Sequence, residues 1–199
     1  MSEQVIEIVT KMGKEEVEKQ LACQCAALIT GLKVSNTFIT SRTNIVRLAN
    51  IFKGTSIACR IIYVNNNKVM FLLYRKGELE EYLKLPKVYK ELKKCGYGGL
   101  KFGDMLKRLT ERYAAYACKN GEFPHELGYF LGYPVEDVLG FIDNEGRNYK
   151  LSGYWKVYGD ADHRKKLFAS FDEAKERLIK LVANEVSLRK ITMAYETAV

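Results

Sequence analysis

Three residues of the sequence could form a nucleophile–base site. Cys25 lies near a predicted helix that ends at Gly31. His125 and Glu126 follow Pro124, in the first turn of another short predicted helix. Free backbone N–H groups and the positive end of the helix dipole at such a turn favour the Glu126 carboxylate and a neutral imidazole. If Cys25 begins a broken helix, its thiolate is favoured as well.

These three side chains support two interpretations. In the first, His125 acts as a base toward the Cys25 thiol, and Glu126 orients the imidazole, which is the minimal arrangement for nucleophilic catalysis. In the second, Cys25 is a small core residue, His125 binds a backbone carbonyl and Glu126 is a helix-start charge. We favour the second interpretation, because nothing in the sequence indicates contact between Cys25 and His125.

A second pair of candidates lies near the end of the chain. Residues 151–158 have the composition of a strand, with Trp155 and Val157 on one face. Tyr154 and Lys156 would then lie on the opposite, exposed face. We expect these two side chains to contact a ligand or a partner.

The glycine-rich stretch 96–103 has a superficial likeness to a phosphate-binding loop. Such loops follow a strand and carry a Lys–Ser or Lys–Thr pair. Here the preceding residues 87–94 are predicted to be helical, and no such pair follows the glycines. The stretch is therefore predicted to be a flexible connection between two helices.

Cysteine spacing gives no sign of a metal site. The five cysteines are irregularly spaced, with no CxxC pair and no Cys/His zinc pattern: Cys23, Cys25, Cys59, Cys95 and Cys118. We expect no disulfide framework, no bound metal and no cofactor. No stretch of about 18 apolar residues could span a membrane, and the acidic N-terminus does not resemble a secretory signal, so we expect a cytoplasmic protein with no membrane partner.

The elements that would position these residues begin with a β-hairpin. Residues 57–64 and 68–74 are both strand-like, and Asn65–Asn67 between them tolerate the positive φ of a tight turn. Because the strand 57–64 is apolar on both faces, we expect it in the middle of a sheet. Residues 34–40 form a further predicted strand.

Helices are predicted over most of the remaining chain. Seven of them have the ranges 5–12, 14–29, 78–83, 86–95, 124–132, 134–146 and 160–186. Two more are predicted to begin at a capping residue, one at Ser41 and one at Asp104. Ser170 could divide the helix 160–186 in two. The pattern predicts one α+β domain over residues 1–199. Its small, mostly antiparallel sheet would contain the central hairpin, at about 57–75, packed by several helices.

The charges are unevenly distributed along the chain, which has a net charge of +8. Bases without any acid occupy residues 19–76, and acids without any base occupy residues 120–146. The basic segment could bind nucleic acid. Alternatively, the two segments face each other within one domain, which is the interpretation we favour, so nucleic acid is a possible partner but not the favoured one.

Three segments resemble a known family: CAALITGLK at 25–33, EFPHELGYFLGYPVEDVLGFI at 122–142 and GYWKVY at 153–158. The family is the bacterial one catalogued as domain of unknown function 3793. The resemblance runs from about Cys25 to the start of the last long helix, and it implies a stand-alone bacterial cytoplasmic protein with no assigned activity. Ala27 stands where the family often has Pro, and Tyr154 where many members have Cys, which weakens the case for a shared cysteine centre there.

Together these features favour a binding or regulatory module whose partner is an unknown small molecule or protein. An enzyme that uses Cys25, His125 and Glu126 is the alternative. Nucleic-acid binding through residues 19–76 is the third possibility.

Overall fold

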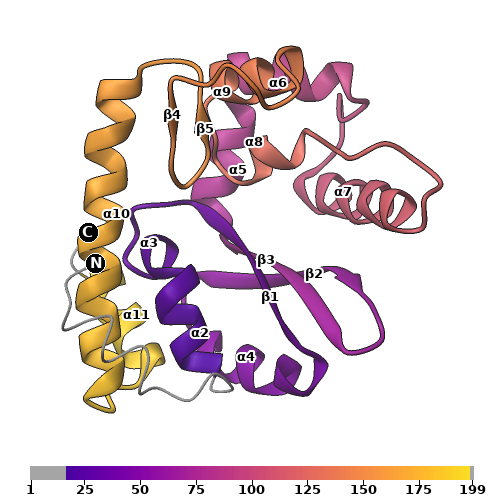
Figure 1. Cartoon of the computed structure of the whole chain (residues 1–199). Coiled ribbons are helices and arrows are strands. Elements are labelled where there is room, and N and C mark those ends of the chain that lie inside the picture. The colour runs from indigo at the N-terminus through magenta and orange to yellow at the C-terminus, as the bar shows by residue number, and fades with distance from the viewer. Residues whose placement is uncertain (1–16, 198–199) are drawn as a thin grey trace.

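Three antiparallel strands lie at the centre of the protein, and helices cover both faces of their sheet (Figure 1). The computed structural model describes residues 17–197. The strands are β1 (Ser35–Ser41), β2 (Ile57–Val64) and β3 (Lys68–Arg75), in the order β1-β3-β2. The α+β class, the small antiparallel sheet and the hairpin are therefore confirmed.

The central strand is β3, not β2 as the sequence suggested. β1 pairs with the free side of β3, which leaves β2 at an edge, and Cys59 on β2 is exposed. The apolar residues of β3 are covered on both faces, because alternate side chains of a strand point to opposite sides. Val69, Phe71 and Leu73 enter one hydrophobic core, and Met70, Leu72 and Tyr74 enter another.

The first core lies on one face of the sheet. Its helices are α2 (Val17–Gln24), α3 (Ala26–Ile29), α4 (Ile45–Phe52), α10 (Ala161–Ala183) and α11 (Leu188–Thr197). Buried Arg75, at the end of β3, donates hydrogen bonds to the carbonyls of Leu28 and Ile29 at 3.1 Å each, so it binds the end of α3. Ser41 accepts a hydrogen bond from Thr43 N at 3.3 Å, but it caps the 3-10 turn η1 (Arg42–Asn44) that precedes α4 and not α4 itself, whose first flanking residue is Asn44.

The second core lies on the opposite face. Its helices are α5 (Lys76–Lys84), α6 (Pro86–Lys94), α7 (Phe102–Ala117), α8 (Leu127–Phe130) and α9 (Val135–Asp143). α7 begins two residues before Asp104, so Asp104 lies in the first turn of the helix and is not its cap. The apolar residues of the two predicted helices between 124 and 146 predict that both Phe130 and Ile142 are buried. Phe130 is fully buried, but Ile142 is 41% exposed, so the prediction for Ile142 is wrong.

The end of the chain departs furthest from expectation. The expected strand at 151–158 is two short strands, β4 (Leu151–Ser152) and β5 (Lys156–Val157), joined by a tight turn. α10 is one continuous helix, capped by Asp160, which accepts a hydrogen bond from His163 N at 3.0 Å. α11 has no counterpart among the predicted helices, and the predicted helix 5–12 lies outside the described residues.

Acids of residues 120–146 form ion pairs with bases other than those of residues 19–76. Glu126 pairs with Arg112, Glu136 with Arg164 at 3.7 Å, and Glu145 with Arg147 at 3.4 Å. These arginines all lie outside residues 19–76, so self-pairing of the basic and acidic segments is wrong for these acids. None of the helices within residues 17–197 is long and apolar enough to cross a membrane.

Candidate functional site

Cys25 occupies a break between α2 and α3, where its backbone has φ −119° and ψ 14°. The helix break that was expected to favour the Cys25 thiolate is therefore present. The Cys25 side chain, however, is only 1% exposed and belongs to the first core. Burial raises the pKa of the Cys25 thiol to about 12, although Asn36 Nδ2 donates a hydrogen bond to Sγ at 3.3 Å. This environment favours the neutral thiol.

Glu126 is held by groups other than His125. It is buried, Tyr97 donates a hydrogen bond to its Oε1 at 3.0 Å, and the Arg112 guanidinium pairs with the same carboxylate. Burial, followed by the charge of Glu126, raises the pKa of the Tyr97 hydroxyl, so this group stays a donor. The carboxylate thus ties α7 to the segment before α8.

His125 points into different surroundings from Cys25 and Glu126. It is exposed, and its ring packs edge-on against Phe123, with 5.2 Å between the ring centroids, and tilted against Phe141 at 5.8 Å. It lines a cavity of about 320 Å³ to which neither Cys25 nor Glu126 contributes. The structure does not bring the three predicted catalytic residues together around one cavity.

This aromatic cavity, as we name it, lies between α8, α9 and the turn joining β4 to β5. Most of its lining is apolar, and it is formed by Phe123, His125, Leu127, Gly128, Leu131, Tyr133, Asp137, Val138, Phe141, Tyr154, Trp155 and Lys156. Both predicted contact residues, Tyr154 and Lys156, are among them, but so is Trp155, which was expected on the opposite face. The difference arises because these three residues belong to the turn and its edge, where strand alternation no longer applies.

Trp155 forms a fixed wall of the aromatic cavity. Its indole ring stacks on Tyr133, with centroids 4.8 Å apart and planes at 26°, and it meets Phe168 edge-on at 4.6 Å. Its Nε1–H donates a hydrogen bond to Asp137 Oδ2 at 2.7 Å. The ring is thus held by packing on two sides and by a charge-assisted hydrogen bond.

Asp137 organises the surrounding backbone. Its Oδ1 accepts hydrogen bonds from Tyr158 N at 2.8 Å and Gly159 N at 2.9 Å, and Arg164 Nε lies 4.0 Å from Oδ2. Sequence reasoning missed this residue, because an acid in the first turn of a predicted helix is usually exposed. Its carboxylate is fully occupied by these partners, so its role is to hold the cavity wall.

One cation, Lys156, is part of the cavity lining. Lys156 Nζ donates a hydrogen bond to the Gly146 carbonyl at 2.7 Å and lies 5.0 Å from the Tyr149 ring centroid and 5.7 Å from that of Phe141. Tyr154 packs against Phe168 and Phe171, and its hydroxyl donates to Asp172 Oδ1 at 3.0 Å. Burial raises the pKa of that hydroxyl, so it too stays protonated.

Two glycines explain how these elements approach so closely. A Cβ atom on Gly140 would lie 2.4 Å from Tyr158 Cγ, and one on Gly153 would lie 2.4 Å from Phe168 Cδ2. Both glycines belong to the segments quoted above for the family resemblance. The recurrence of Gly and aromatic residues there was the available signal for a close-packed aromatic site.

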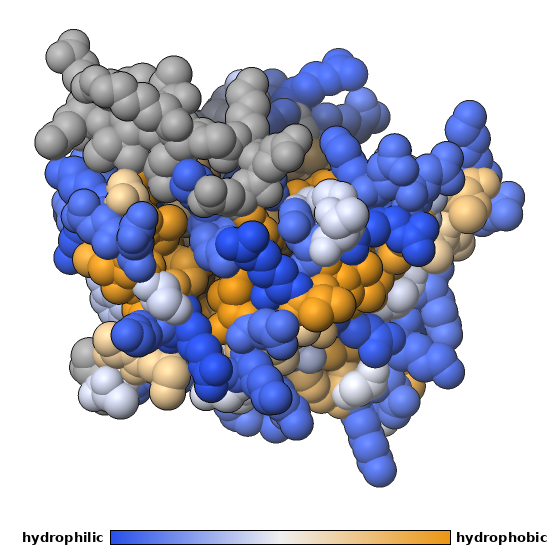
Figure 2. Space-filling model, turned by 90° about the horizontal axis from the view of Figure 1, so that it is seen from below, coloured by the Kyte–Doolittle hydropathy of each residue, from blue (hydrophilic) through white to orange (hydrophobic). Residues whose placement is uncertain are grey.

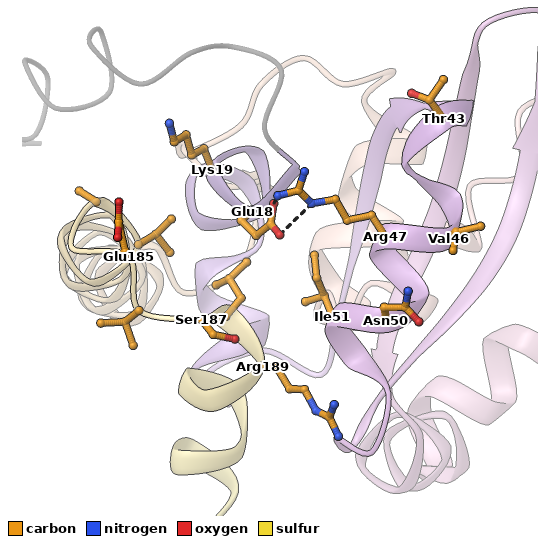
Figure 3. A pocket seen from close by; sticks show the side chains of 14 residues that line it. Glu18, Lys19, Thr43, Val46, Arg47, Asn50, Ile51, Glu185, Ser187 and Arg189 are labelled. Atoms are coloured by element: carbon orange, nitrogen blue, oxygen red, sulfur yellow. Dashed lines mark hydrogen bonds and ion pairs between the residues drawn. The ribbon is translucent and has the colours of Figure 1, made fainter.

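A larger, shallower cavity of about 1060 Å³ lies at the other end of the molecule, between α2, α4 and the chain that joins α10 to α11 (Figure 3). Arg47 and Glu18 face each other across it in an ion pair at 2.9 Å, and none of its described lining residues is aromatic. The surrounding face has a band of apolar surface between hydrophilic side chains (Figure 2), and Val46 on α4 is 71% exposed.

Nothing within residues 17–197 forms a group of three or more His, Cys, Asp or Glu that could hold a metal ion.

Comparison with curated proteins and with solved structures gives no match. One family model, described as "Protein of unknown function (DUF3793)", matches residues 21–192 and so covers every element that lines the aromatic cavity. The chain belongs to this family.

Proposed function

We propose that the protein is a binding module that takes a small, planar, mostly apolar ligand with an acidic group into the aromatic cavity. The observation that carries the proposal is the fixed Trp155 wall in a concave, apolar site. Cavities for small molecules commonly have volumes of about 300–1,000 Å³, with apolar linings and a few placed polar groups. At about 320 Å³ this cavity suits a ligand of one or two rings.

The polar groups of the cavity define the ligand further. The Asp137 carboxylate is already satisfied by the backbone and by Trp155, which leaves His125 and Lys156 as the groups that would meet a ligand. The Lys156 ammonium has three N–H donors and uses one of them for the Gly146 carbonyl, so it can still donate to an anion in the cavity. A ring would lie beside Trp155, and its carboxylate or sulfonate would lie toward Lys156.

The enzyme alternative does not enter this proposal, because the Cys25 thiol is buried away from the cavity and Glu126 is paired with Arg112. The family resemblance supports three further parts of the proposal: that the protein is bacterial, that it works in the cytoplasm, and that residues 1–199 form one domain. A small molecule, rather than nucleic acid, is the partner that the cavity lining favours.

The test uses 1-anilinonaphthalene-8-sulfonate as the probe, because it joins a planar two-ring naphthalene group to a sulfonate and becomes fluorescent in apolar surroundings. Trp155 is the only tryptophan in the sequence, so binding in the aromatic cavity should quench tryptophan emission as the probe becomes fluorescent. Lys156→Met and Phe141→Ala should each weaken binding several-fold. The matched control is Lys166→Met, which removes an exposed lysine of α10 outside the cavity.

Saturable binding to the wild type, weakened by the two cavity variants and not by the control, would support the proposal. Probe fluorescence that rises without quenching of Trp155, or that is equally weakened by all three variants, would place the probe elsewhere and overturn it. Melting curves of each variant check that the fold is retained.

A further inference from the structure

A third cavity, of about 710 Å³, lies between the hairpin, α5, α6 and the start of α7. It is distinct from the aromatic cavity and shares no lining residue with it. Its lining residues are Cys59, Arg60, Tyr74, Lys76, Glu80, Leu83, Lys84, Tyr89, Leu100, Lys101, Phe102, Gly103, Met105 and Leu106. We call it the basic cavity, because four of these residues are cationic and one is acidic.

The four cations of the basic cavity differ in how many hydrogen bonds and ion pairs they form. Lys84 is balanced by Glu80 at 3.2 Å and by Glu81 at 3.0 Å. Within the described part of the chain, the ammonium groups of Lys76 and Lys101 have no hydrogen-bond or ion-pair partner. Arg60 makes one long hydrogen bond, from Nε to Thr110 Oγ1 at 3.4 Å, which leaves its terminal nitrogens available. Three positive charges of the lining, those of Arg60, Lys76 and Lys101, therefore have no ion-pair partner among residues 17–197, because the one acid of the lining, Glu80, is paired with Lys84.

Aromatic rings form part of the same wall. Tyr74 is buried and meets Phe102 edge-on, with ring centroids 5.8 Å apart. Tyr89 is 39% exposed, and its hydroxyl accepts a hydrogen bond from Gly99 N at 3.0 Å. That bond fixes the Tyr89 ring relative to the glycine-rich loop, so the ring offers an exposed face of defined position.

The glycine-rich stretch thus contributes to a site in a way that its sequence pattern does not reveal. It joins α6 to α7, as predicted, and it does not follow a strand. Its last residues, from Leu100 to Gly103, nevertheless line the basic cavity together with Arg60 of the hairpin and Lys76 of α5. Cations from three separate parts of the chain converge there only in the folded protein.

We propose that the basic cavity binds a mononucleotide, with the phosphates at Arg60, Lys76 and Lys101 and the base against Tyr89 and Phe102. Cavities lined by one sign of charge concentrate ions of the opposite sign, and arginine forms paired hydrogen bonds with phosphate oxygens. Exposed aromatic rings stack on nucleic-acid bases of any type. A bounded cavity of this volume favours a single nucleotide over a polynucleotide, which requires a groove that follows its backbone.

Isothermal titration calorimetry with ATP, tripolyphosphate and adenosine tests the proposal. ATP should bind with one site per chain, tripolyphosphate more weakly, and adenosine most weakly. The double variant Lys76→Met/Lys101→Met should weaken ATP binding at least tenfold. Its matched control, Lys87→Met/Lys90→Met, removes two exposed lysines of α6 that lie outside the cavity and should change binding less than twofold.

The stacking part of the proposal has its own pair of variants. Tyr89→Leu removes the ring and should reduce the preference for ATP over tripolyphosphate. Tyr89→Phe keeps the ring and removes only the hydroxyl, so the preference should be retained. Equal loss in both variants would contradict stacking on Tyr89.

Two other outcomes would overturn the proposal. Equal weakening by the cavity and control lysine pairs would mean that ATP responds only to net charge. A single-stranded octanucleotide that binds more tightly than ATP, and is weakened by the same cavity variants, would identify a nucleic-acid surface instead. All four lysines are exposed, so unchanged melting temperatures are expected and verify that binding, not folding, is measured.

Discussion

Lys33 is a buried cation that contacts no acidic side chain among residues 17–197. It is 9% exposed, its Nζ donates a hydrogen bond to Asn36 Oδ1 at 3.1 Å, and it lies 4.9 Å from the centroid of the Tyr133 ring. Burial lowers the pKa of Lys33 from 10.5 to about 8. The ring and the amide offset only part of the cost of removing the charge from water.

This lowered pKa predicts a pH-dependent stability. Between pH 8 and 10.5 the unfolded chain binds more protons at Lys33 than the folded chain does, so the free energy of unfolding rises with pH across that window. Lys33→Met should therefore be more stable than the wild type at pH 7, by a difference on the order of 3 kcal/mol. Chemical denaturation at a series of pH values should show this advantage shrinking from pH 8 to 10.5.

The Lys166→Met variant serves as the control, because Lys166 is exposed. Its stability relative to the wild type should be nearly constant over the same pH range. A constant advantage of Lys33→Met across the window would mean that Lys33 titrates alike in both states, contrary to the prediction.

The buried thiol of Cys25 leads to a prediction about alkylation. Because Cys25 is 1% exposed and its pKa is raised to about 12, iodoacetamide should modify it far more slowly than exposed Cys118 at pH 8. Peptide mass spectrometry over time gives the rate at each cysteine. Rapid reaction at Cys25 that slows in His125→Ala would restore the nucleophile–base interpretation.

Among the contacts between elements, the Arg112–Glu126 pair is strongly asymmetric. The Arg112 side chain is 43% exposed and that of Glu126 is 2% exposed. Arg112→Met leaves a buried carboxylate without its cation and should lower the free energy of unfolding by about 3–5 kcal/mol. In Glu126→Gln the arginine can turn to water, so the free energy of unfolding should fall by only about 1–2 kcal/mol. Urea unfolding of both variants measures the difference, and equal losses would contradict this account.

The packing of α9 on the β4–β5 hairpin predicts a severe effect at Gly140. A methyl group there would lie 2.4 and 2.5 Å from Tyr158 Cγ and Cβ. Because Cβ is fixed to the backbone, rotation of the tyrosine side chain cannot remove this overlap. Gly140→Ala should lower the free energy of unfolding by about 1–3 kcal/mol or more, which a thermal melt would show as a lower melting temperature. Gly77→Ala in α5, where nothing lies within 4 Å, should be neutral or stabilising by about 0.5–1 kcal/mol. Comparable melting temperatures for the two variants would contradict the close packing.

Elements with local signals were predictable from the sequence, and those fixed by distant contacts were not. The hairpin has two apolar strands and an Asn turn, in which Asn65 Oδ1 accepts a hydrogen bond from Lys68 N at 3.0 Å. The β4–β5 hairpin instead depends on Asp137 of α9, which accepts hydrogen bonds from Trp155 Nε1 in the turn and from the backbone N–H groups of residues 158 and 159 after β5. The aromatic cavity therefore needed the tertiary structure, although its Gly and aromatic residues stood in the segments that identify the family.

At the scale of the whole molecule, the two cores meet at β3, which contributes three buried side chains to each of them. Leu72 and Leu73 of β3 are both fully buried, one in each core. A strand that is apolar on both faces is predicted to be covered on both faces. The sequence did not determine which strand of the hairpin is the central, doubly covered one. That depended on β1, which pairs with β3 from outside the hairpin.

A shared central strand predicts that the two cores unfold together. Phe38 lies in the first core and Phe130 in the second, both with 0% exposure, so each change to alanine should cost about 3–5 kcal/mol. Far-UV circular dichroism reports all helices, whereas Trp155 fluorescence reports the region around the aromatic cavity. Because neither face of β3 can stay buried when the other core opens, both signals should shift to the same lower midpoint in each variant. If Phe38→Ala lowers the circular dichroism midpoint and leaves that of Trp155 unchanged, the two faces are independent units, and the proposal of one domain over residues 1–199 fails.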